Sequence, residues 1–118
     1  LPISATFRMT DIWRSFVAQR CLWELNLGVT FHSPSEVFQD RNPHDLIQDF
    51  KSEVPGYVFN DRIVEILEET ELKKGQENIC ENLITCYRAI INEGILPETE
   101  IESVKAWVKD YESITSKQ

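Results

Sequence analysis

From Gln76 to Gly94 the chain reads QENICENLITCYRAIINEG, and this stretch carries the clearest structural signal in the sequence. Apolar residues recur in it every three or four positions, at Ile79, Leu83, Tyr87 and Ile90. That spacing puts them on one face of an α-helix, and a glycine such as Gly94 commonly ends a helix. The stretch therefore predicts an amphipathic helix over residues 76–93 that packs against a core.

The same kind of pattern predicts four more helices. Each shows an apolar stripe together with a residue that suits a helix start or stop. The predicted ranges are residues 11–25, 43–54, 61–69 and 100–113, with caps at Thr10, Asn42, Asn60 and Thr99, stops at Asn26 and Gly28, and a break at Pro55-Gly56. Thr99 and Glu102 have the spacing of a capping box.

Two short strands are also predicted, both before residue 33. Apolar and polar residues alternate from Ile3 to Met9, which is typical of a half-buried strand, and Val29 to His32 has the composition of a second one. The expected fold is therefore mainly α with a few short β-strands.

Composition limits the classes of function. The chain has 118 residues, 42 % of them hydrophobic, and a net charge of −8 spread along its length. Nucleic-acid binding is not expected, because it needs a clustered cationic face. No run approaches the roughly 20 apolar residues of a membrane span. Three cysteines without a metal-type spacing predict reduced, buried thiols, and the acidic residues Glu100 and Glu102 are expected to be solvated.

Three features before residue 50 could carry chemistry. Asp11 lies at a predicted strand-to-helix junction, where open α/β folds bind ligands, although it could simply help to cap the helix. His32 could ligate a metal or be an ordinary surface histidine. Arg41, Asn42 and His44 surround a predicted helix start, which suits a phosphate but equally an ordinary cap.

Together these features resemble a known family. The residues that carry this resemblance are the run from Thr6 to Arg8, the runs 11–14 and 18–24, Val29, Phe31-His32 and 39–42. They resemble the C-terminal part of glycosyltransferases related to plant STELLO proteins. The runs 49–50 and 83–87 continue this resemblance. A more distant similarity is carried by Asp11-Ile12-Trp13, 27–29, His32-Ser33 and Asn42-Pro43. These residues are similar to those of reversibly glycosylated polypeptides, which act as UDP-arabinopyranose mutases.

This resemblance implies the C-terminal part of an α/β fold of the GT-A type, with residues 1–60 in the catalytic domain and residues 61–118 in a helical region packed on it. It implies that Asp11 is a catalytic base and that His32 is a ligand for Mn²⁺ or Mg²⁺. It also implies a nucleotide sugar and an acceptor as partners. The residues implied to bind substrate or phosphate are Arg8, Trp13, Arg41, Asn42 and His44.

Because the sequence begins at Leu1 and has no Asp-x-Asp pair suited to a metal, we expect part of a longer protein. Alone, the chain should bind no metal and transfer no sugar. If the crossover is right-handed, Asp11 and His32 should lie within about 12 Å of each other in one crevice. The alternative is a non-catalytic binding or assembly module on a glycosyltransferase-like scaffold, since the residue before Asp11 is Thr10 rather than an acid. A cytoplasmic and a Golgi-type location are both compatible with the sequence.

Overall fold

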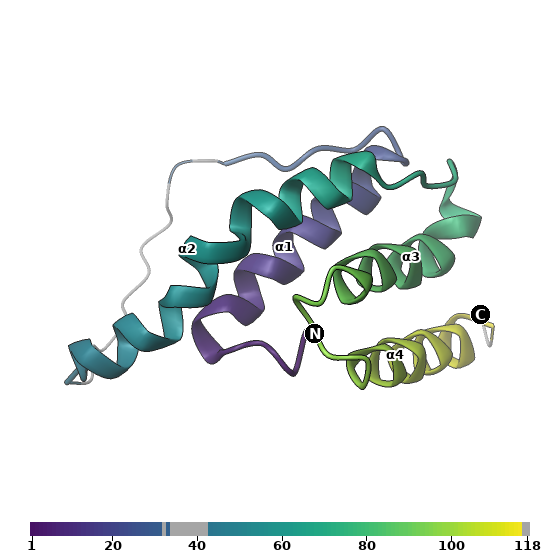
Figure 1. Cartoon of the computed structure of the whole chain (residues 1–118). Helices are drawn as coiled ribbons and strands as arrows, with labels where there is room; N and C mark the ends of the chain where they lie inside the picture. Colours follow the sequence, from purple (N-terminus) through teal and green to yellow (C-terminus); the bar gives the residue numbers. More distant parts are fainter. Residues whose placement is uncertain (32, 34–42, 117–118) are drawn as a thin grey trace.

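The computed structural model of the chain describes residues 1–31, 33 and 43–116. This part contains the helices α1 (Phe7–Trp23), α2 (Leu46–Glu69), α3 (Ile79–Asn92) and α4 (Glu100–Thr115), with a 3-10 turn η1 (Gln76–Asn78) before α3. Helix α1 lies along α2, α3 packs against both, and α4 packs on α3 (Figure 1). The described residues contain no β-strand, and the expectation of short strands is wrong for them.

The core draws on all four helices, because each presents an apolar stripe to its neighbours. Burying such side chains is worth about 1.5–3 kcal/mol each. The most enclosed members are Val17 of α1, Ile63 and Leu67 of α2, Cys86, Tyr87 and Ile90 of α3, and Ile101 and Val104 of α4. All three cysteines are free, as expected; Cys21 and Cys86 are buried and Cys80 is half-buried.

The first six residues do not form the predicted strand. The backbone amides of Ile3 and Ser4 donate to the carboxylate of Glu100 at 3.0 and 2.9 Å, and the Ser4 hydroxyl adds a contact of 2.5 Å. Glu100 is 1 % exposed, so the expectation that it is solvated is wrong. The chain start therefore lies beside the start of α4 (Figure 1). Helix α1 begins at Phe7, four residues earlier than predicted.

The second predicted strand is also absent from the described residues. Val29 and Phe31 are exposed and lie in irregular backbone, because no neighbouring strand is present to accept their hydrogen bonds. A fold of the GT-A type requires a sheet, so the expected α/β fold is wrong for the described chain, which is all-α. Asn26, with φ of 56°, follows the end of α1 as predicted.

Helix α2 continues through Pro55-Gly56, where a break was predicted. An internal proline costs about 3 kcal/mol or more. Burial of Ile63, Ile66 and Leu67 in the same helix offsets this cost. Gly56 also allows α1 to approach closely, since a Cβ there would collide with Sδ of Met9. The two predicted helices of residues 43–54 and 61–69 are therefore one.

Helix ends were predicted with mixed success. Asp45, not Asn42, caps α2, and its carboxylate accepts from the amides of Ile47 and Gln48. Thr99 makes no side-chain cap bond, so the predicted capping box is absent. Gly94 follows α3 with φ of 79°, which confirms the predicted stop. The domain boundary at residue 60 stays a prediction; Asn60 lies inside α2.

We predict that Glu100→Gln lowers the free energy of unfolding by about 1–3 kcal/mol, because the neutral amide loses the charge-assisted bonds that the buried carboxylate makes to the backbone amides of Ile3 and Ser4. Urea unfolding followed by circular dichroism measures this. The exposed Glu102 of the same helix turn provides the control, since Glu102→Gln should leave the unfolding midpoint in place. Equal stability of Glu100→Gln and the unsubstituted chain would contradict the role given to Glu100.

Candidate functional site

Two of the predicted binding residues meet where the first turns of α1 and α2 come together. Nη2 of Arg8 lies 2.6 Å from Oδ2 of Asp49, and Nδ1 of His44 lies 3.0 Å from the same oxygen. The hydrogen bond from Arg8 lowers the pKa of the Asp49 carboxyl, and the same contact raises the pKa of Arg8. Arg8 and His44 are therefore brought together, and the anion that they share is a carboxylate of the chain itself.

Asp11 lies one turn further along α1 and is exposed. Its carboxylate makes no hydrogen bond or ion pair with any residue in the described part of the chain. Its backbone carbonyl accepts from the Ser15 hydroxyl at 2.7 Å, within the helix. The predicted capping role is absent, because α1 begins at Phe7 and Asp11 lies in its second turn. The side chain is therefore available for an external partner.

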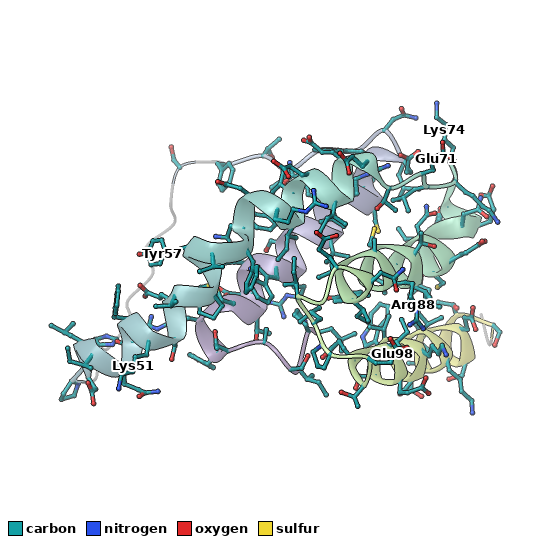
Figure 2. The ribbon with its side chains drawn as sticks, viewed as in Figure 1. Lys51, Tyr57, Glu71, Lys74, Arg88 and Glu98 are labelled. Atoms are coloured by element: carbon teal, nitrogen blue, oxygen red, sulfur yellow. The ribbon has the colours of Figure 1, made fainter. Side chains whose placement is uncertain are left out.

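An open groove of about 670 Å³ runs between the first half of α1 and the middle of α2, and Asp11 lines it. Arg14 and Glu53 also line it, and within the described residues neither has a hydrogen bond or ion pair. Two aromatic side chains border the same groove: Phe7 is 91 % exposed, and Tyr57 is 77 % exposed and projects from α2 (Figure 2). Arg8 also lines the groove, and besides Asp49 the charges of Glu53 and Asp11 help to raise its pKa. The groove thus combines exposed aromatic rings with charged groups, those of Asp11, Arg14 and Glu53, that are not tied up in hydrogen bonds or ion pairs within the described chain.

Trp13 was predicted to bind substrate, and the structure places it in the core. It is 3 % exposed, and its Nε1 donates to Oδ1 of Asn60 at 2.8 Å. The bond satisfies the indole N–H and ties α1 to α2. Asn60 therefore bonds to a neighbouring helix, whereas the sequence predicted that it would cap one.

The remaining predicted site residues, His32, Arg41 and Asn42, lie outside the described residues, and so does the predicted distance from Asp11 to His32. Across residues 1–31, 33 and 43–116, no group of three His, Cys, Asp or Glu side chains could hold a metal ion. The described residues therefore do not fit a complete metal centre.

None of the helices described is long and apolar enough to cross a membrane.

Comparison with known proteins identifies the family. The model of the STELLO glycosyltransferases matches residues 8–117, nearly the whole chain. The chain belongs to this family. No curated protein and no solved structure matches the chain, so the more distant similarity to reversibly glycosylated polypeptides stays a prediction. Membership of the STELLO family makes this a glycosyltransferase-like protein.

Four side chains of the groove were not predicted as site residues from the sequence, namely Phe7, Arg14, Glu53 and Tyr57. Glu53 and Tyr57 are four residues apart and therefore share a helix face. This signal was hidden because Pro55-Gly56 was interpreted as a helix end. Arg14 follows Asp11 by three residues on α1, so the two side chains share a face in the same way.

We predict that Arg8→Gln raises the pKa of Asp49 toward its ordinary value, because the hydrogen bond from Arg8 is the main cause of the lowered pKa. A titration of the carboxyl carbons by nuclear magnetic resonance measures the shift. A matched control is Arg62→Gln, which removes the equivalent partner of Glu93 and should leave Asp49 unchanged. If Asp49 titrates identically with and without Arg8, the ion pair is not formed in solution.

Proposed function

We propose that the groove between α1 and α2 is the acceptor side of a nucleotide-sugar-dependent glycosyltransferase site, with Asp11 as the catalytic base. The observation that carries this proposal is the exposed Asp11 carboxylate, which makes no hydrogen bond or ion pair in the described chain, inside a groove of a STELLO-family protein. The family match supports the reaction class, and the groove supports the choice of residue.

Asp11 has the access that a general base requires. A base must come within about 2.6–3.2 Å of the hydroxyl whose proton it takes. A carboxylate already engaged by a cation, such as Asp49, is less available for this task. In the proposed step the acceptor hydroxyl gives its proton to Asp11, its oxygen bonds to the anomeric carbon of the donor sugar, and the nucleoside diphosphate leaves.

The lining of the groove suits a saccharide. Aromatic rings such as Phe7 offer a flat apolar surface that packs against the C–H face of a sugar ring. Carboxylates such as Glu53 accept hydrogen bonds from hydroxyls, and the guanidinium of Arg14 donates several in a fixed plane. These groups line the same groove, and neither Glu53 nor Arg14 makes a hydrogen bond or ion pair among the described residues.

The donor side of the site is a separate part of the proposal. His32, Arg41 and Asn42 stay as candidates there, with His32 as a metal ligand, on the family resemblance alone. The described residues form no metal group, so no step is assigned to Mn²⁺ or Mg²⁺. For the same reason we expect the 118-residue chain by itself to transfer no sugar.

A non-catalytic binding module is the alternative function. It is favoured by the large apolar surface on the first half of α2, which is typical of an interaction site. A module of this kind would keep the groove but would not need Asp11 as a base. Binding and transfer therefore have to be measured separately.

We predict that the chain binds neutral saccharides weakly in this groove. Maltotriose, cellotriose and xylotriose, titrated into isotope-labelled protein, should shift the backbone resonances of residues 8–14 and 53–60 in magnetic resonance spectra. Phe7→Ala should weaken binding roughly fivefold, since a stacked ring contributes about 1 kcal/mol. Phe31→Ala is the matched control, because Phe31 is equally exposed but does not line the groove.

Asp11→Asn should keep saccharide binding within a few fold, because the amide still accepts a hydrogen bond. The same substitution in a family member that transfers sugar should abolish transfer. Transfer that survives it would exclude Asp11 as the base, and shifts confined to other residues would exclude the groove. Turnover of a nucleotide sugar by the 118-residue chain alone would contradict the division into donor and acceptor sides.

A further inference from the structure

The outer face of α2 carries a continuous apolar stripe over its first half. At about 100° per residue, six apolar side chains fall within roughly a 120° sector of the helix. Their exposed fractions range from 39 % at Val54 to 77 % at Tyr57. We call this set the α2 seam; its members are Leu46, Ile47, Phe50, Val54, Tyr57 and Val58.

The seam has the spacing of a helix-pairing surface. Ile47, Phe50, Val54 and Tyr57 are separated by three, four and three residues, which is the repeat of a coiled coil. The core of the chain uses the opposite face of α2, through Gly56, Ile63 and Leu67. Since no described helix covers the seam, this repeat is not explained by packing within the described chain.

The stripe has clear ends. Asp45 precedes it as the cap of α2, and Asp61 occupies the next position of the repeat after Tyr57. A carboxylate at such a position ends the apolar surface, because burying it without a partner is costly. The α2 seam is therefore a bounded patch of two heptads rather than part of a longer coiled coil.

We propose that the α2 seam is a two-fold interface at which this chain pairs with a second copy of itself. The area suits this occupant. A standard interface buries about 800 Å² per partner. Two of the six side chains are aromatic, with surfaces of about 150–250 Å² each. At the exposed fractions given above, the six side chains together expose roughly the area that each partner buries in a standard interface.

Residue type and charge also agree with self-pairing. Ile47 and Val54, the first residues of each heptad, are β-branched, as is common at this position in two-stranded parallel coiled coils, and the aromatic residues Phe50 and Tyr57 take the place of the leucine usual at the fourth position. Lys51 and Glu53 flank the seam on opposite sides, and Lys51 projects from this half of α2 (Figure 2). In a parallel pair Lys51 faces Leu46 of the copy and Glu53 faces Val58, so like charges do not meet.

This inference is independent of the proposed glycosyltransferase site. Phe50 and Val54 belong to the seam and do not line the groove, although Tyr57 borders both. Substitutions at Phe50 and Val54 therefore test pairing without altering the saccharide surface. Loss of pairing and loss of saccharide binding are distinguishable outcomes.

The test is sedimentation equilibrium of the 118-residue chain over a wide range of micromolar concentrations. The unsubstituted chain should be a dimer in equilibrium with a monomer. Phe50→Glu and Val54→Glu should each raise the dissociation constant by at least about thirtyfold, which is the loss expected at the centre of an interface. Ile114→Glu, at an equally exposed apolar site near the end of α4, should leave it unchanged.

Hydrogen exchange provides a readout that needs no substitution. Amides of residues 46–58 should exchange more slowly at high than at low protein concentration, and those of α4 should not change. A chain that stays monomeric at every concentration would overturn the proposal. A dimer that resists both seam substitutions would also overturn it, since another surface must then form the contact.

Discussion

The packing of α1 on α2 depends on one buried arginine. Nε of Arg20 donates to the carbonyl of Leu67 at 2.7 Å, and its Nη2 donates to the carbonyl of Thr70 at 2.8 Å. Its Nη1 pairs with Glu24 at 2.6 Å, so the charge is balanced although Arg20 is only 9 % exposed. The carbonyls at the end of a helix lack partners within that helix, and Arg20 supplies donors to them from α1. Removing it would leave buried carbonyls and a carboxylate without partners, which is costly.

A second buried charge fixes the other end of α1. Glu100 holds the backbone of Ile3 and Ser4 against the start of α4. This contact sets the position from which α1 begins, while Trp13 and Asn60 tie its middle to α2. The groove lies on the side of α1 between these contacts, so its side chains project from a backbone that is held at several points. Such support is what a binding site needs if its groups are to keep their relative positions.

The two surfaces proposed to act lie next to each other on α2. The groove combines charged side chains with aromatic rings, the seam is apolar, and Tyr57 belongs to both. Continuity of α2 through Pro55 is what joins them on one helix. If this helix broke at Pro55-Gly56, Glu53 and Tyr57 would no longer share a face, and both surfaces would be interrupted. The proline therefore costs stability at a position where the helix carries two surfaces.

The sequence by itself determined the helices, their apolar faces and the family. Periodic apolar residues are a local property, which is why the ends of α3 and α4 were predicted to within three residues. The exposed Asp11 was also selected from sequence, through its neighbours in the family pattern.

Tertiary structure decided the rest. Alternation from Ile3 to Met9 favoured a strand, but a strand needs a partner, and Glu100 instead engages the first amides. Likewise Pro55 predicted a helix end, and only the burial of distant residues of α2 shows why the helix continues. Buried charges such as Arg20 and Glu100 look solvated in sequence, because all of their partners except Glu24 are between 47 and 97 residues away along the chain. Only the folded chain brings them together.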